Sequence, residues 1–218
     1  MMKNNFREPI NALTHLIGAV LSLLGLIAML VLLKVTHQVH PATLCSVLAF
    51  GVGLIALYYT SFYYHAVLDR TKATLLRLKK TDHSMIFLLI AGSYTPFCLL
   101  CLSGTLRVTM MIAIWGIAIL GVFMMIFWID MPRWLNTTLY IALGWAAVFA
   151  LKPLYLALPA GGFFLLVAGG VVYTIGGVMY GIKKPNLPHG FGFHEIFHIF
   201  VMLGSACHFA AVFCYILL

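Results

Sequence analysis

Acidic side chains are scarce in this sequence. Only five Asp and Glu occur among 218 residues, charged residues make up 8% of the chain, and 63% of the residues are hydrophobic. The mean hydropathy is +1.06. A water-soluble domain cannot bury that much apolar surface, so the composition excludes a soluble enzyme or binding domain. The segments between the apolar runs are too short for a second domain, and we expect one membrane domain over residues 1–218.

Long apolar runs make up most of the chain. A helix that rises about 1.5 Å per residue needs about 20 residues to cross about 30 Å of hydrocarbon. Seven runs have about this length, at residues 13–33, 42–64, 84–102, 108–129, 135–151, 162–182 and 194–217. Lipid cannot satisfy exposed backbone groups, and the runs are too long and too uniformly apolar for barrel strands. The sequence therefore predicts an all-α membrane protein, a bundle of seven transmembrane helices.

The basic residues are divided unevenly between the predicted loops. If the N-terminus is cytoplasmic, ten of the thirteen Lys and Arg lie on the cytoplasmic side, and Lys34, Arg107 and Lys152 lie outside. Cytoplasmic loops carry such an excess, so we predict a cytoplasmic N-terminus and an outside C-terminus. This bias, together with the anionic headgroups of the lipid bilayer, accounts for the net charge of +8. A nucleic-acid partner is not needed.

Histidines and an acid mark the cytoplasmic ends of three predicted helices. His65 ends the second run, Asp82 precedes the third, and His194 and His198 open the seventh. Because successive helices alternate in direction, these ends share one face of the membrane. An ionisable group at membrane depth is costly unless a partner satisfies it, so we expect these side chains to serve a common site.

The spacing of these histidines predicts a metal site. His194 and His198 lie four residues apart, so both imidazoles can bind one ion from one side of a helix. With His65 they supply three nitrogen ligands, and three imidazoles plus a water is the layout of a catalytic zinc site. Asp82 would accept a hydrogen bond from that water, and Ser61 could hold the water or support a ligand. The alternative is that the histidines lie at the membrane interface, bonded to backbone or headgroups.

Residues 194–198 also spell HExxH, the zinc-protease motif in which the Glu acts as general base. The extended protease pattern needs a ligand six residues after the second His, where this chain has Gly204. No acidic residue follows Glu195 either. A protease is therefore disfavoured, although Glu195 is a candidate second base.

Two further histidines, His15 and His208, lie within the predicted helices. His15 opens the first run on the cytoplasmic side, where it either supports the site or is simply a helix-start residue. His208 lies on the same helix face as His194 but about 15 Å deeper than His198 at helical rise. That separation is too large for the same ion.

Several motifs together resemble the hemolysin III family. They are EPINALTH at 8–15, SFYYH at 61–65, DHS at 82–84 followed by AGSYTP at 91–96, and HEIFH at 194–198. The family belongs with the progestin and adiponectin Q receptors, a superfamily of seven-helix membrane proteins. The resemblance covers nearly the whole chain and implies zinc held by His65, His194 and His198, with Asp82 and Ser61 close to the metal water. The short loops and N-terminus differ from the receptor members and suggest a bacterial inner (plasma) membrane protein.

The resemblance also implies a reaction, because the wider superfamily resembles ceramidases that cleave a lipid amide. We expect a zinc-dependent hydrolase of a membrane lipid, in which zinc activates its water and polarises the carbonyl. Asp82 would move the proton, Ser61 would orient the water, and the lipid would enter sideways from the cytoplasmic leaflet. The alternative is a receptor or a pore-forming cytolysin in which zinc only fastens helices. The fourth to sixth runs carry almost no charge, which disfavours a stable pore.

Overall fold

Helices account for nearly all of the described chain. The computed structural model describes residues 6–68, 70–128, 131–187 and 191–218. Its elements are α1 (Pro9–Val35), α2 (Pro41–Ala66), α3 (Lys72–Pro96), the π-helical turn η1 (Phe97–Cys101), α4 (Gly104–Phe127), α5 (Arg133–Gly144), the 3₁₀ segment η2 (Trp145–Ala150), α6 (Leu151–Ala157), α7 (Ala160–Ile182) and α8 (Phe193–Tyr215). Within these residues seven spans are long and apolar enough to cross a membrane, and no strand occurs. The predicted fold class is confirmed.

The third span starts earlier than expected. α3 begins at Lys72 instead of Ser84, and the side chain of its N-cap residue, Thr71, accepts a hydrogen bond from the backbone N–H of Thr74 at 3.2 Å. Its first turns carry several Lys and Arg, which hide this part of the helix from a search for apolar runs. A polar N-cap and good helix formers nevertheless start the helix there. As a result Asp82 lies inside α3, about three turns from its start.

The fifth span continues past the expected end at Leu151. α5, η2 and α6 follow one another without a loop, and the chain stays helical to Ala157. Lys152 and Pro153 had indicated a loop, but Pro153 falls in the first turn of α6, where its missing N–H is tolerated. The change from α-helix to 3₁₀ at Trp145 marks the join.

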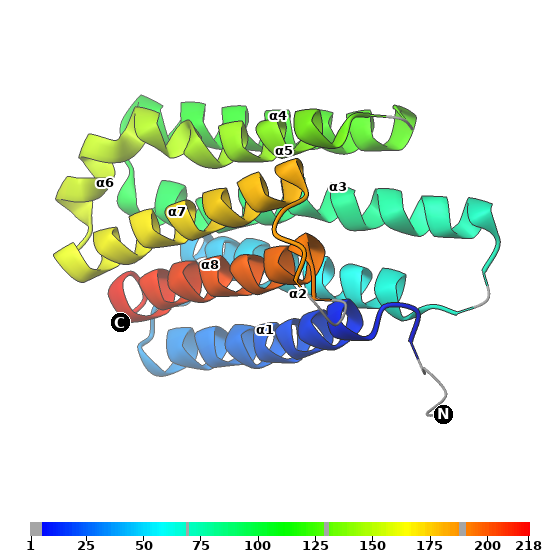
Figure 1. Ribbon diagram of the computed structural model, residues 1–218. Coiled ribbons are helices and arrows are strands. Elements are labelled where there is room, and N and C mark those ends of the chain that lie inside the picture. The colour runs from blue at the N-terminus through cyan, green and yellow to red at the C-terminus, as the bar shows by residue number, and fades with distance from the viewer. Residues whose placement is uncertain (1–5, 69, 129–130, 188–190) are drawn as a thin grey trace.

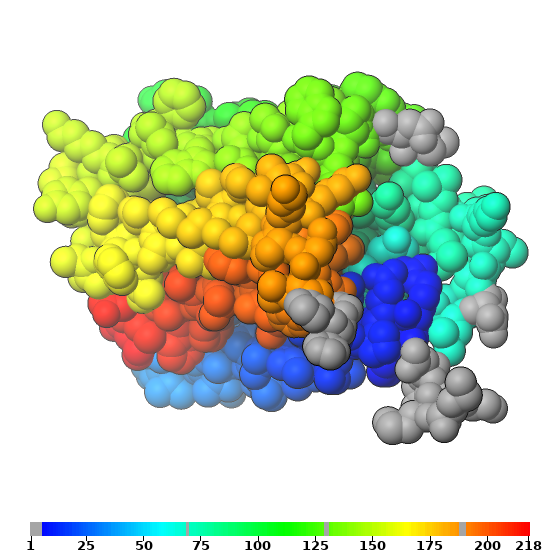
Figure 2. All heavy atoms as spheres, in the orientation of Figure 1, coloured from blue at the N-terminus to red at the C-terminus, as the bar shows by residue number. Residues whose placement is uncertain are grey.

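The helices run side by side along the bundle, and the start of α1 and the end of α8 lie at its opposite ends (Figure 1). α1 packs against α2 and α8, α2 against α3, α3 against α4, and α7 against α8 and α5. The start of α1, the end of α2 and the starts of α3 and α8 therefore lie at one end of the bundle, here named the N-terminal end. In Figure 2 the first residues of α1, in dark blue, lie at this end beside the segment before α8, in orange.

Close helix packing and an apolar outer surface complete the bundle. Large apolar side chains such as Leu21, Ile112 and Phe149 are exposed, as expected of a lipid-facing surface. Inside, Gly92 of α3 lies against α2, and a Cβ atom there would approach the carbonyl oxygen of Ala49 to 2.6 Å. Small residues allow such approach where no hydrophobic force drives helices together in lipid.

Candidate metal centre

Three histidines converge at the N-terminal end of the bundle. His65 lies in the last turn of α2, and His194 and His198 lie in the first two turns of α8. One nitrogen from each ring lies within 4.8 Å of the others. The ring centroids are 5.0 Å apart for His65 and His194, 5.0 Å for His65 and His198, and 4.9 Å for His194 and His198. His65 and His198 are buried and His194 is half-buried, so one small ion could touch all three rings.

The hydrogen bonding of His65 fits a metal ligand. Its Nδ1 lies 2.6 Å from Oε2 of Glu8, whereas its Nε2 is buried and has no hydrogen-bond partner in the described part of the chain. If Nδ1–H donates to the carboxylate, Nε2 carries a lone pair that faces the other two histidines. Metal-binding histidines commonly donate their second ring N–H to a carboxylate in this way. An unpartnered buried ring nitrogen is costly, and a metal ion would remove that cost.

Glu8 is held firmly against His65. Besides the side-chain contact, the backbone N–H of Glu8 donates to the carbonyl oxygen of His65 at 3.1 Å. The hydrogen bond with His65 lowers the pKa of the Glu8 carboxyl to about 2, although partial burial acts in the opposite direction. Glu8 is therefore a carboxylate at any physiological pH. Sequence reasoning missed this residue; the only signal was that a chain with five acids places one of them within the first motif.

Asn11 connects Glu8 to the start of α8. Its Nδ2 donates to Glu8 Oε2 at 3.2 Å and to Glu195 Oε1 at 2.9 Å. The other oxygen of Glu195 accepts a hydrogen bond from the backbone N–H of Gly192 at 2.8 Å and so caps α8. Both oxygens of Glu195 are thus engaged in the fold, and Glu195 is not among the residues that line the cavity described below. This arrangement gives no support to the protease interpretation of HExxH.

His198 and His15 lie against each other. The hydroxyl of Thr14 lies 3.4 Å from Nδ1 of His198 and donates to carbonyls of α1, so it can accept from the imidazole. That bond would leave Nε2 of His198 for a metal. His15 stacks on His198 with ring centroids 3.6 Å apart and 13° between planes, and both its ring nitrogens are buried without partners. His15 is therefore part of the site's surroundings and not only a helix-start residue.

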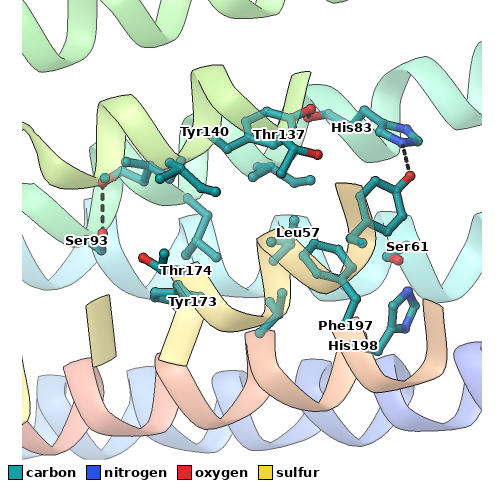
Figure 3. A pocket seen from close by; sticks show the side chains of 18 of the residues that line it. Leu57, Ser61, His83, Ser93, Thr137, Tyr140, Tyr173, Thr174, Phe197 and His198 are labelled. Carbon is teal, nitrogen blue, oxygen red and sulfur yellow. Dashed lines mark hydrogen bonds between the residues drawn. The ribbon is translucent and has the colours of Figure 1, made fainter. Parts of the chain in front are cut away.

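Two of the three histidines, His194 and His198, line a mostly apolar cavity of about 130 Å³, here named the main cavity. Ser61, Asp82, His194 and His198 all line it, and Asp82 is buried at 9% exposure. Asp82 lies close to both Ser61 and His65. In Figure 3 Ser61, His83 and His198 lie at one end of the cavity, Ser93 lies at the other, and Leu57 and Phe197 lie between them. The structure thus places four of the five predicted site residues on the lining of this cavity, and the fifth, His65, lies beside His194 and His198.

His208 lies at the far end of the main cavity. Its Nε2 is 3.2 Å from the carbonyl oxygen of Leu166, and it does not belong to the group of three histidines. The loop residue His189 and the acids Asp69 and Asp130 lie outside the described residues.

Comparisons with known proteins agree with the motifs. The profile of a family described as "Haemolysin-III related" matches residues 3–209. The chain is 36% identical to "Hemolysin-3 homolog" of Bacillus subtilis over 95% of this chain and 93% of that protein. It is 39% identical to "Hemolysin-3" of Bacillus cereus over 96% and 92%. A more distant relative is "ADIPOR-like receptor IZH2" of Saccharomyces cerevisiae, 26% identical over 92% of this chain and 69% of that protein.

Proposed function

The chain belongs to the haemolysin-III related family of membrane proteins, and from that membership and the geometry above we propose that it is a zinc-dependent hydrolase of a membrane lipid amide or ester. One observation carries the proposal. Three histidines, one with an unpartnered buried Nε2, converge at the end of an apolar cavity that also holds a buried carboxylate. A metal that only fastened helices would not need either the cavity or Asp82.

The donor set favours zinc. His65, His194 and His198 would hold the ion through neutral imidazoles, and a site with three imidazole ligands keeps a position open for water or substrate. When bound, zinc acts as a Lewis acid that polarises a carbonyl oxygen and makes water nucleophilic near neutral pH. Glu8 and Thr14 would keep two of the rings in the tautomer that presents Nε2 to the ion.

The protein's own side chains would bind the lipid and transfer the proton. The apolar part of the main cavity holds an acyl chain so that its carbonyl lies beside Ser61 and Asp82. Ser61 orients the water, whose oxygen bonds to the carbonyl carbon while Asp82 accepts its proton. Asp82 then returns the proton to the leaving nitrogen or oxygen as the amide or ester bond breaks. The products are a fatty acid and an amine or alcohol.

The test pairs metal content with lipid release. Asp82→Asn keeps the shape of the side chain but removes the proton acceptor. We expect the variant to retain its metal, since the three imidazoles remain, and to release fatty acid about 10² to 10⁴ times more slowly from a panel of amide and ester lipids. Undiminished release from a metal-loaded variant would remove Asp82 from the reaction.

The second candidate is a receptor or cytolysin in which the metal is structural. This candidate is retained because the yeast relative is named a receptor and the Bacillus cereus relative is named a hemolysin. In that case neither wild type nor Asp82→Asn would release fatty acid, and loss of metal would lower thermal stability. Complete absence of release across the panel would replace the hydrolase with this account.

We further propose that the N-terminal end of the bundle faces the cytoplasm and that the protein resides in a bacterial inner membrane. The start of α1, the first turns of α3, the start of α5 and the end of α7 bring basic residues to this end: Arg7, Lys72, Arg77, Lys79, Lys80, Arg133, Lys183 and Lys184. This distribution is typical of a cytoplasmic face. A reporter fused after Leu218 should be active only outside the membrane; cytoplasmic activity would reverse the orientation.

A further inference from the structure

A second, smaller pocket lies beside the main cavity at the N-terminal end of the bundle. It has a volume of about 70 Å³, and its lining includes Lys79 and Lys80 from α3, Trp128 after α4, Arg133 at the start of α5, and Tyr180 from α7. We name it the basic pocket. Nothing in the proposed hydrolysis uses it.

Among the residues that the structure describes, the basic pocket concentrates positive charge without a compensating acid. Lys79, Lys80 and Arg133 all line it, and no carboxylate does among the residues described. In the same part of the chain the ion pairs are those of Glu8 with Arg7 and His65, so none of the three cations forms one. Clustered cations without a partner repel one another, and an anion between them would relieve that repulsion.

The guanidinium of Arg133 packs against aromatic rings but keeps an unused hydrogen-bond donor among the residues described. Its guanidinium lies 4.7 Å from the ring centroid of Tyr180 and 5.2 Å from that of Phe193. These aromatic contacts fix the guanidinium plane without neutralising its charge. Its Nη1 is buried and donates no hydrogen bond to any residue that the structure describes, which is costly for a charged donor. Arg is also the residue best suited to bind phosphate oxygens through two parallel hydrogen bonds.

The start of α5 adds to this preference. Arg133 is the first residue of the helix, and its N-cap residue, Pro132, makes no side-chain capping bond. The first backbone N–H groups of a helix attract anions. On the other side of the pocket Lys80 donates one N–H to the carbonyl oxygen of Ile126 at 2.5 Å, which holds its ammonium in place.

The depth of the pocket indicates where the anion comes from. Lys79 and Lys80 lie about one turn before the apolar part of α3, which begins at Met85, and Trp128 follows the apolar α4 and is 47% exposed. Basic and tryptophan side chains at such positions lie in the headgroup layer of a membrane. Basic pockets between transmembrane helices are known binding sites for anionic headgroups. We propose that the basic pocket binds the phosphate of an anionic phospholipid.

The pocket is adjacent to the candidate metal centre. His83 and Tyr180 line both the basic pocket and the main cavity, and His83 Nε2 lies 3.1 Å from the hydroxyl of Tyr180. A phosphate in the pocket is thus separated from the main cavity by one layer of side chains. The site is inferred from charge, burial and depth alone and stands whether or not the protein hydrolyses lipids.

Binding can be measured without any turnover. The purified, metal-loaded protein is immobilised on scintillation beads and titrated with radiolabelled dioleoylphosphatidylglycerol or radiolabelled inorganic phosphate, with dioleoylphosphatidylcholine as unlabelled competitor. The test variants are Arg133→Gln and the pair Lys79→Gln/Lys80→Gln. The matched control is the pair Arg77→Gln/Lys183→Gln, which removes two exposed cations from the same end of the bundle but outside the pocket lining. Thermal unfolding and metal content verify that each variant is folded.

We expect one saturable site for phosphatidylglycerol per chain, weakened about tenfold or more in each test variant and by no more than about twofold in the control. Phosphatidylcholine should not compete. If only inorganic phosphate binds with this dependence, the anion site stands and its ligand is a soluble phosphate. If Arg133→Gln fails to fold, the pair Lys79→Gln/Lys80→Gln decides the outcome. Binding of both probes that is indifferent to these residues, or equal competition by phosphatidylcholine, would overturn the proposal.

Discussion

The two ends of the bundle differ in chemistry. At the N-terminal end, Glu8, Asn11, His15, Ser61, His65, Asp82, His83, His194, Glu195 and His198 form connected polar contacts or line the main cavity. At the opposite end, in the residues described, polar side chains mostly bond to nearby backbone carbonyls, as Thr36 does to Leu32 and Arg107 to Leu102. Those bonds satisfy individual groups, whereas the N-terminal end keeps buried nitrogens unpartnered. The difference indicates that one end is built for a ligand and the other for packing.

The largest effect should come from the two histidines of α8. We expect His194→Ala/His198→Ala to abolish tight metal binding, because a single imidazole remains. The matched control is His37→Ala/His40→Ala, at the junction of α1 and α2 at the opposite end, which should keep one equivalent of metal by elemental analysis. A full equivalent in the first pair would disprove the ligand assignment and remove the contrast between the ends.

A smaller effect should follow from Glu8. Glu8→Ala removes the acceptor of His65 Nδ1–H, and metal affinity should fall about 10- to 100-fold, the usual worth of such a partner. Glu8→Gln keeps an oxygen that can accept the bond and should recover most of that loss. Affinity is measured by competition with a chromophoric chelator. Equal affinities for all three proteins would mean that Glu8 only anchors the chain.

Acid should release the metal through the imidazoles and not through Glu8. Protons compete with the metal for the imidazole nitrogens, which must be neutral to bind it, so occupancy should fall progressively as the pH is lowered. The lowered pKa of Glu8, about 2, means that the stability contributed by its carboxylate is present above the ordinary Glu value and is lost only as the pH falls through about 2. Metal content after dialysis at stepped pH measures the release. Occupancy that does not change with pH over the range in which the protein stays folded would argue against a three-imidazole site.

The stability of the contact between α2 and α3 should depend on side-chain volume. Gly92→Ala forces a Cβ against the Ala49 backbone and should cost about 1 to 3 kcal/mol of stability. Gly116→Ala, in α4, adds a Cβ with no atom within 4 Å and should leave stability the same or raise it slightly, because Ala favours the helix more than Gly does. Thermal unfolding in the same detergent compares them. Equal unfolding temperatures would show that the α2–α3 contact is looser than described, and neither variant should alter metal content.

The fold class and the meeting of the three histidines at one end of the bundle could be predicted from the sequence. Apolar runs of membrane-spanning length can cross a membrane only as helices or barrel strands, and these runs are too long for strands. The alternation of helix direction then brings His65 and His198 to one end of the bundle, although they are 133 residues apart in the sequence. The start of α3 at Lys72 was missed because hydropathy cannot detect a helix that extends beyond the apolar layer.

The contacts around the histidines could not be predicted. Asn11 and Glu195 are 184 residues apart and meet only because α1 packs against α8. Glu8 reaches His65 because the segment before α1 folds back onto the end of α2. Such contacts depend on helix packing and on the path of a short irregular segment, and neither leaves a periodic signal in the sequence.

The most direct test of the account is an anomalous difference map from crystals of the purified protein, collected just above and just below the zinc absorption edge. The account predicts one peak per chain, present only above the edge, at about 2.0 to 2.1 Å from one nitrogen each of His65, His194 and His198, with His65 bound through Nε2. A map with no peak among these rings, or with its only peak elsewhere in the bundle, would contradict it.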